Sequence, residues 1–236
     1  MRNIPLLLLL FITGPFVAVS QPRSANENLN LNELFNKKVD GAAKIFIGPE
    51  YIYPPFTKSG SPFFGSDTLS PGWIVYEGHL YDNQNLQWDV QRDFVLIRAL
   101  NGYSKIILRN EYIDSFYFAG HKIVNVPADP AINLNTGGLY DVLYGGKTQV
   151  LVRRKKDTKS QIRDDRVIYE FYDLDKIYIR KKGTYYLVEN RKDLLHVLAD
   201  ERAAINRKIN KEGLNWKRDF EACVTVAASY YDEINH

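Results

Sequence analysis

Short apolar runs alternate with turn residues through the middle of the chain. The apolar run at 94–97, Phe-Val-Leu-Ile, has no polar position, so we expect it to form a central strand that is covered on both faces. Short strands at this spacing, with no helical pattern between them, are typical of an antiparallel meander. The predicted strands are residues 73–81, 86–90, 94–100, 105–108, 113–118 and 123–126, with turns at Asp82-Asn83, Asn101-Gly102 and Ala119-Gly120.

A first hairpin is predicted after the linker at 129–138, which is rich in Pro, Asn and Gly. Residues 139–144 and 147–152 flank Gly145-Gly146, a pair that can form a two-residue loop. This loop would pair Asp141 with Val150 and place a mostly apolar face inward.

A second hairpin is predicted around Lys182-Gly183, with 177–181 opposite 184–188. One of its faces is apolar and carries Ile177, Ile179, Tyr186 and Val188. The opposite face is aromatic and basic, and we expect it to be either solvated or a contact surface; it carries Tyr178, Arg180 and Tyr185.

The periodicity changes from two to about 3.6 after Val188, which predicts helices. Asn190 is placed to cap the first helix, Asp200 to cap a second that stops at Gly213, and Asn215 to cap a third. The third helix keeps one face apolar over about five turns, and this stripe must pack against some other part of the protein. Its members are Trp216, Phe220, Cys223, Ala227, Tyr230 or Tyr231, and Ile234.

The first twenty residues have the pattern of a signal peptide. Arg2 precedes the apolar run 6–12, and Ala18-Val19-Ser20 has the small residues that a signal peptidase accepts. The run is too short to span a bilayer. We therefore predict cleavage after Ser20 and export, with the mature chain either periplasmic or secreted.

The rest divides into an N-terminal segment at 21–72 and a body at 73–236, with a possible subdivision near 127–138. Residues 22–44 predict one short helix, and the high density of Pro and Gly from 48 to 72 predicts a long loop. We expect the aromatic side chains of this loop to cover the sheet rather than to meet a partner: Tyr51, Tyr53, Phe56, Phe63 and Phe64.

Composition supports a sheet. Tyr and Phe number 16 and 12 against 1 Met, and aromatic residues favour strands. We predict a mainly antiparallel β protein with some α structure: a two-layer sheet, either a sandwich or a partly open barrel, followed by C-terminal helices. The net charge of +3 is too small to indicate a nucleic-acid partner, and a single cysteine cannot form an intramolecular disulfide.

No catalytic, metal or cofactor motif is recognisable. The histidines at 79, 121, 196 and 236 are dispersed, and we interpret them as solvated or hydrogen-bonded surface residues. Cys223 falls on the apolar stripe, so we expect a buried, unreactive thiol. No glycine-rich phosphate loop opens a helix, and neither a zinc nor an EF-hand spacing occurs.

Two basic runs and two tyrosines are the candidate binding residues. Charged strand ends usually protect a sheet edge; the functional alternative is an anionic envelope partner such as lipid headgroups or lipopolysaccharide phosphate. The candidate anion-binding residues are Arg153, Arg154, Lys155, Lys156, Arg180, Lys181 and Lys182, and the candidate contact aromatics are Tyr178 and Tyr185.

Several segments resemble a recurring pattern in uncharacterised exported proteins of Gram-negative bacteria. The resemblance covers residues 73–235 and is carried by residues 86–93 (LQWDVQRD), 139–147 (LYDVLYGGK), 151–156, 182–186 (KGTYY) and 190–195 (NRKDLL). It implies export and a β-rich body with a helical tail, and it supplies no activity and no catalytic residue.

These observations favour an exported cell-envelope or secreted protein that binds or scaffolds without catalysis. Its partner would be an anionic envelope component or another envelope protein, and its oligomeric state stays open. One alternative is a hydrolase that uses a carboxylate pair assembled across the sheet. Another is a lipid or lipoprotein carrier, which requires an apolar cavity between the sheet and the helices.

Overall fold

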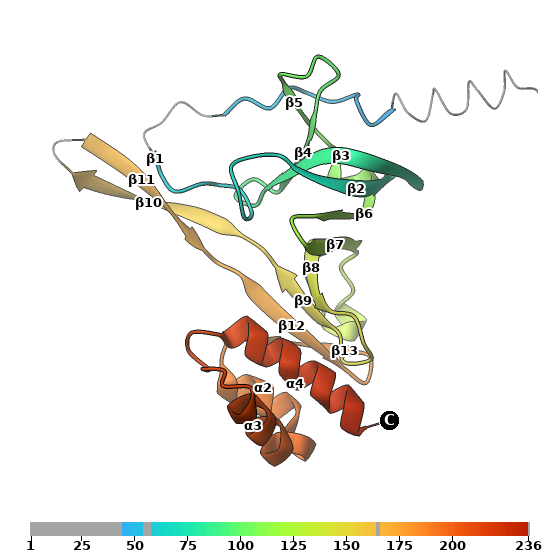
Figure 1. Cartoon of the computed structure of the whole chain (residues 1–236), viewed down its shortest axis with the longest axis vertical. Coiled ribbons are helices and arrows are strands. Elements are labelled where there is room, and N and C mark those ends of the chain that lie inside the picture. Colours follow the sequence, from blue (N-terminus) through green and yellow to red (C-terminus); the bar gives the residue numbers. More distant parts are fainter. Residues whose placement is uncertain (1–43, 54–57, 164–165, 236) are drawn as a thin grey trace, which may run out of the picture. The chain divides into compact units, whose positions relative to one another are not determined.

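The computed structural model describes residues 44–53, 58–163 and 166–235, and these belong to one compact unit (Figure 1). The predicted signal peptide, and all but the last residue of the helical segment predicted at 22–44, lie outside the described residues.

Ten strands form one open antiparallel sheet in the order β13-β12-β9-β8-β7-β6-β2-β3-β4-β5. A mainly antiparallel sheet followed by helices was the predicted fold class, and the structure confirms it. The outer strands are β13 and β5. The bounds are β2 Ser70–Tyr76, β3 His79–Asp89, β4 Phe94–Arg98, β5 Lys105–Ile107, β6 Ile113–Phe118, β7 His121–Val126, β8 Gly138–Tyr144, β9 Val150–Arg153, β12 Lys176–Lys181 and β13 Thr184–Val188.

A smaller sheet pairs β1 (Lys58–Ser59), β11 (Arg166–Asp173) and β10 (Lys156–Arg163) in that order. β10 follows β9 after two residues, and β11 leads into β12, so this hairpin extends the β9–β12 pair (Figure 1). The sequence analysis did not predict it. β10, Lys-Asp-Thr-Lys-Ser-Gln-Ile-Arg, carries no apolar run. β11 does contain apolar and aromatic residues, but the described side chains of the hairpin are exposed or half-buried.

The meander contains one wrong turn assignment. The hairpin between β2 and β3 turns at Glu77-Gly78, where both residues have positive φ (50° and 71°). The predicted turn at Asp82-Asn83 lies inside β3 instead, where the register against β2 shifts by one residue. A polar bulge within a strand resembles a turn in sequence, because both interrupt the apolar alternation.

β4 is covered on both faces, as predicted, although it is next to the outer strand rather than central. Its residues Val95, Leu96 and Ile97 are fully buried. Tyr51 and Phe63 from the long loop cover Leu96. Phe64 packs elsewhere on the sheet, Tyr53 is 43% exposed, and Phe56 lies outside the described residues. Covering of the sheet by the loop is therefore confirmed for three of its rings.

The two later hairpins differ in how well the sequence predicted them. In the β8–β9 hairpin Asp141 pairs with Val152 rather than with Val150, so the predicted register is wrong by two residues. The loop is longer than two residues because Asp232 of the last helix accepts hydrogen bonds from the Thr148 N–H (3.0 Å) and the Tyr144 hydroxyl (3.1 Å).

The β12–β13 register is confirmed, with Ile177 opposite Val188 and Lys181 opposite Thr184.

The helical segment comprises α2 (Arg191–Val197), the short 3₁₀ turn η3 (Ala199–Glu201), α3 (Arg202–Lys211) and α4 (Phe220–Ile234). Two further 3₁₀ turns lie between strands of the large sheet, η1 at Asn110–Tyr112 and η2 at Pro130–Ile132. Asn190 caps α2 as predicted. Asp200 does not cap α3; it accepts hydrogen bonds from Lys181 and Tyr231. Asn215 accepts from two backbone N–H groups in a turn that precedes α4.

The interface between the sheet and the helices is packed with apolar side chains. β9, β12 and β13 contribute one side of this core and α2, α3 and α4 the other. Most of the predicted stripe lies in or against this core: Cys223 and Ala227 are at 0% and 1% exposure, whereas Ile234 at the end of α4 is 39% exposed. The core residues are Val150, Val152, Ile177, Ile179, Val188, Leu194, Leu195, Leu198, Ile205, Ile209, Cys223, Val224, Ala227, Ala228 and Tyr231.

Candidate functional site

A buried arginine lies at the crossing between the two sheets. Arg154, in the two-residue step from β9 to β10, is 7% exposed. Its guanidinium donates to Asp141 on β8 (2.7 and 3.0 Å), to Asp175 in the turn before β12 (2.7 Å), and to Glu221 on α4 (2.5 and 3.0 Å). Burial alone would lower the pKa of Arg154, but the hydrogen bonds to these carboxylates raise it. We call these four residues the Arg154 cluster.

The carboxylate of Asp141 is fully buried and has a second neighbour besides Arg154, the imidazole ring of His121. Nδ1 of His121 lies 3.0 and 3.1 Å from its two oxygens. The Phe64 ring meets the His121 ring edge-on at 4.8 Å. The carboxylates that the sheet gathers here thus contact a guanidinium and an imidazole, and do not face one another across an open cleft.

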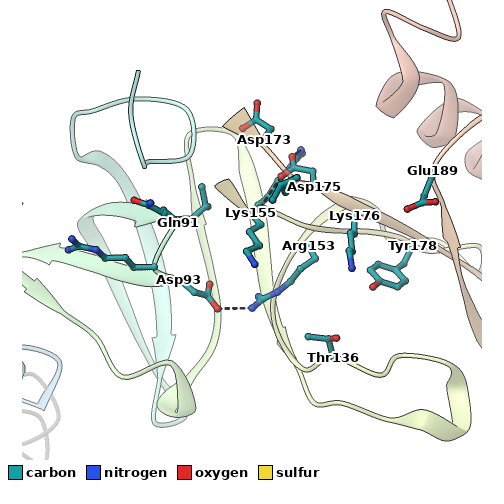
Figure 2. Close-up of a pocket in the computed structure, with 14 residues that line it drawn as sticks. Gln91, Asp93, Thr136, Arg153, Lys155, Asp173, Asp175, Lys176, Tyr178 and Glu189 are labelled. Carbon is teal, nitrogen blue, oxygen red and sulfur yellow. Dashed lines mark hydrogen bonds and ion pairs between the residues drawn. The ribbon is translucent and has the colours of Figure 1, made fainter. Parts of the chain in front are cut away.

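A pocket of about 750 Å³ lies beside this cluster. Residues from the β3–β4 turn, the β9–β10 step and the β11–β12 turn line it. Figure 2 shows that Arg153, Lys155 and Lys176 lie next to one another with their nitrogen-bearing ends pointing into it, beside the ring of Tyr178. We call this the crossing pocket.

Arg153 is fixed in the wall of the crossing pocket. Nη2 donates to Asp93 on the facing segment at 2.7 Å (dashed in Figure 2), and Nη1 donates to the Leu139 carbonyl at 2.6 Å. The guanidinium carbon also lies 5.6 Å from the centre of the Tyr140 ring. Burial raises the pKa of Tyr140 to about 12, so this ring is neutral at physiological pH. Arg153 is therefore positioned by the protein itself.

Several charged side chains of the crossing pocket have no ion-pair partner among the described residues. Lys155 and Lys176 have exposed side chains, and neither forms an ion pair with any described residue. The same is true of the carboxylates of Asp173 and Glu189. Burial raises the pKa of Tyr178, which keeps its hydroxyl protonated and able to donate. The pocket thus offers unpaired groups of both signs and a hydrogen-bond donor.

The strand register separates the second basic run from the first. Arg153 pairs with Lys176 at one end of β12, whereas Arg180 lies four residues further along, roughly 13 Å away at 3.3 Å per residue. The tips of the two late hairpins and the end of α4 line another pocket there, of about 610 Å³. We call it the tip pocket; its basic residues are Lys147, Arg180, Lys181 and Lys182.

The remaining basic candidates have structural partners. Lys181 donates to Asp200 at 2.8 Å and to a carbonyl of α2 at 2.8 Å. Lys156 donates to the carbonyls of Ser61 and Phe63 at 3.1 and 2.8 Å and so holds the long loop. The sequence therefore grouped residues that the structure uses in different ways.

The aromatic and basic face of the β12–β13 hairpin is covered at Tyr185, while Arg180 on the same face is exposed. Tyr185 is 5% exposed and packs with Leu134, Tyr140 and Leu151. Its hydroxyl hydrogen-bonds to Gln149. The linker between β7 and β8 folds over this face, so Tyr185 is neither solvated nor open to a partner. Tyr178 lies on the same face and reaches the crossing pocket.

Other classes of site find little support in the part of the chain that the structure describes. No group of three or more His, Cys, Asp and Glu residues is placed to hold a metal there, and no helix there is long and apolar enough to cross a membrane. Cys223 is buried, and this raises the pKa of its thiol. Comparisons with protein-family models, with curated proteins and with solved structures found no match to this chain.

The sequence analysis missed Lys176, Asp93 and Glu189, which lie far from the basic runs along the chain. One signal for the Arg154 cluster was present. Asp141 was expected on an inward, mostly apolar face, and a buried carboxylate requires a cation or several donors nearby. The sequence does not tell whether Arg153 or Arg154 supplies that cation. The choice depends on the two-residue step between β9 and β10, which turns Arg154 toward Asp141.

Proposed function

We propose that the chain is an exported binding protein, of the cell envelope or secreted, which holds a phosphate-bearing ligand in the crossing pocket. One observation carries this proposal. Lys155 and Lys176 come from separate segments, point into the pocket beside Arg153, and form no ion pair with any described residue. Ammonium groups bind phosphate as point charges, and a guanidinium adds directed hydrogen bonds.

The acidic residues of the pocket restrict the rest of the ligand. A bare anion would be repelled by Asp173 and Glu189, which also line the pocket without partners among the described residues. A ligand that carries amino or hydroxyl groups next to its phosphate would pair with these carboxylates. We therefore expect a phosphorylated amine or alcohol, of which phosphoethanolamine is the simplest example.

The pocket is supported by a rigid frame. The Lys155 N–H donates to Asp175 at 2.9 Å, and Asp175 is itself held by Arg154. Arg153 is fixed by Asp93. The Lys155 backbone and the Arg153 guanidinium are therefore positioned before binding and lose little conformational entropy when a ligand arrives; the exposed side chains of Lys155 and Lys176 are ordered by the ligand itself.

The two alternative functions have less support. A hydrolase would need two carboxylates that face each other across a substrate. Asp141, Asp175 and Glu221 all bind Arg154. The two unpaired carboxylates of the crossing pocket, Asp173 and Glu189, do not point toward one another in Figure 2. A lipid carrier would need a hollow between the sheet and the helices, and apolar side chains fill that interface. Binding at a polar pocket is the function that we retain.

Isothermal titration with phosphoethanolamine and with inorganic phosphate tests the proposal. The variant Lys155→Ser/Lys176→Ser should lose at least about tenfold in affinity, since each lost charge weakens binding by about 1 kcal/mol. The matched control is Lys147→Ser/Arg180→Ser, which removes two charges from the tip pocket. Loss of binding in the control variant alone would move the ligand to the tip pocket and refute the proposal.

A second arm distinguishes a lipid headgroup from a soluble ligand. Co-sedimentation with phosphatidylglycerol and phosphatidylethanolamine vesicles, at two salt concentrations, should pull down the protein if the ligand is a lipid. Binding should then fall as salt shortens the screening length. If the protein binds soluble phosphoethanolamine in the titration but does not sediment with vesicles, its ligand is soluble.

Export is tested separately. The proposed cleavage after Ser20 predicts that the protein recovered from the periplasm or the medium begins at Gln21 when its N-terminus is sequenced. A chain that keeps Met1 and stays in the cytoplasm would contradict export, and it would leave the pocket proposal standing.

A further inference from the structure

A separate pocket lies at the β5 edge of the large sheet. It has a volume of about 450 Å³ and shares no lining residue with the crossing pocket or the tip pocket. Residues 49–51 run along β5 (Figure 1), since the Tyr51 N–H donates to the Lys105 carbonyl (2.8 Å) and the Ile107 N–H donates to the Pro49 carbonyl (2.9 Å). We call it the aromatic pocket, after the rings that line it: Tyr51, Tyr53, Phe63 and Tyr103.

The protein itself fixes the inner rings of the aromatic pocket. Tyr51 and Phe63 are 9% and 4% exposed, and their ring centres lie 6.0 Å apart. The Tyr51 hydroxyl donates to the buried carboxylate of Asp89 at 2.8 Å. Tyr53 is 43% exposed, and its ring centre lies 6.1 Å from that of Phe63. The pocket therefore has a fixed aromatic base, and Tyr53 adds a ring that is partly open to solvent.

The ring of Tyr103 extends into solvent from the turn between β4 and β5. It is 94% exposed, so the described residues cover almost none of it. The turn itself is fixed: Oδ1 of Asn101 accepts hydrogen bonds from the N–H groups of Tyr103 and Ser104, both at 3.0 Å, and the Ser104 hydroxyl donates to Glu50 at 2.5 Å. An exposed ring on a fixed turn gains apolar burial only when another molecule covers it. Tyr103 thus supplies a contact face that loses little backbone entropy on binding.

Charges of both signs line the aromatic pocket. The carboxylates of Glu50 and Asp67 form no ion pair with a described residue. Nζ of Lys105 lies over the Phe63 ring, 5.1 Å from its centre, and donates to Gln87 at 2.6 Å. This ammonium would repel a cationic ligand from the ring that it already covers, and the two carboxylates would repel an anionic ligand. A neutral ligand with hydroxyl groups can donate to the carboxylates and accept from the ammonium.

We propose that the aromatic pocket binds a neutral saccharide. The C–H groups on one face of a pyranose ring form an apolar surface, which packs against the rings of Tyr53 and Tyr103. The hydroxyl groups at the edge of the sugar pair with Glu50, Asp67 and Lys105. Aromatic walls with a few polar groups, around a volume of several hundred Å³, are typical of sites for small molecules.

Isothermal titration of the full chain with neutral sugars tests the proposal. The probes are glucose, cellobiose, N-acetylglucosamine and its dimer N,N′-diacetylchitobiose, and we expect binding of at least one. Tyr103→Ala should weaken that binding by about two- to tenfold, because one aromatic contact is lost, and it should leave the melting temperature unchanged because the ring is exposed. Tyr172→Ala is the matched control: it removes a ring that is 38% exposed on β11, outside the aromatic pocket, and should leave sugar binding unchanged.

Charged derivatives of glucose test the choice of a neutral ligand. Glucosamine adds a positive charge to the same ring and glucuronate adds a negative one. Both should bind more weakly than glucose, because Lys105 repels the first and Glu50 and Asp67 repel the second.

Three results would overturn the proposal. The first is that none of the four neutral sugars binds. The second is that Tyr103→Ala binds them as tightly as the native chain does. The third is that glucosamine or glucuronate binds more tightly than glucose, which would assign the aromatic pocket to a charged ligand. The proposal for the crossing pocket depends on none of these results, because Tyr103→Ala should keep the native affinity for phosphoethanolamine.

Discussion

Replacing Arg154 should destabilise the fold strongly while leaving its backbone unchanged. The substitution Arg154→Met preserves an apolar stem of similar length and removes the cation that three carboxylates contact at 2.5–3.0 Å. Asp141, at 0% exposure, then keeps His121 as its side-chain partner. Removal of one partner from a buried ion cluster costs about 3–5 kcal/mol. For a unit of this size the melting temperature should fall by roughly 6–20 °C.

Urea unfolding, followed by tryptophan fluorescence, measures this change. Arg218→Met is the matched control, because its ion pair with Asp219 lies at the surface (76% exposed) and should contribute less than about 1 kcal/mol. The double variant Arg154→Met/Asp141→Asn should recover part of the loss, since the amide carries no charge that requires a cation. A loss below about 1 kcal/mol for Arg154→Met, or no recovery in the double variant, would refute this account of the cluster.

Three further predictions concern α4. Deletion of 214–236 should lower the free energy of unfolding by more than about 3 kcal/mol, since each large buried side chain contributes about 1.5–3 kcal/mol; unchanged cooperative melting would make α4 an appendage. Cys223 should resist alkylation until the protein unfolds, because it is fully buried and its thiol pKa is raised; rapid native labelling would contradict this. The pKa of Asp232 is lowered because hydrogen bonds from Thr148 and its neighbours outweigh the effect of burial. Its contribution to stability is therefore complete above the ordinary pKa of about 4 and is lost as the pH falls through the lowered value. Asp232→Asn should destabilise at pH 7, and urea midpoints of the two proteins should converge below pH 4; a constant difference would contradict the sign.

Local signals predicted the elements in which sequence and structure agree. The Lys182-Gly183 turn fixed the register of its hairpin because a two-residue loop permits one pairing, and Asn190 capped its helix because the cap contacts lie within three residues. The register predicted for the Gly145-Gly146 hairpin was wrong because Asp232, more than eighty residues away in the sequence, accepts a hydrogen bond from the loop. The turn predicted at Asp82-Asn83 was wrong because a bulge within a strand resembles a turn in sequence.

The candidate site was only partly predictable for the same reason. Arg153, Lys155 and Tyr178 were singled out from the sequence and do line one pocket. Adjacent Arg154 is distinguished from them only by the break between β9 and β10, which turns it inward to Asp141. Lys176 joins the pocket through the β9–β12 pairing, a long-range contact that no local pattern encodes.

The central claim is that Lys155 and Lys176 bind phosphate in the crossing pocket. The most direct measurement is the affinity for phosphoethanolamine of the native chain, of Lys155→Ser/Lys176→Ser and of Lys147→Ser/Arg180→Ser, by isothermal titration at two salt concentrations. We expect binding that weakens with salt, at least about a tenfold loss in the first variant, and no change in the second. Equal affinity in all three proteins, or no binding by the native chain, would contradict the claim.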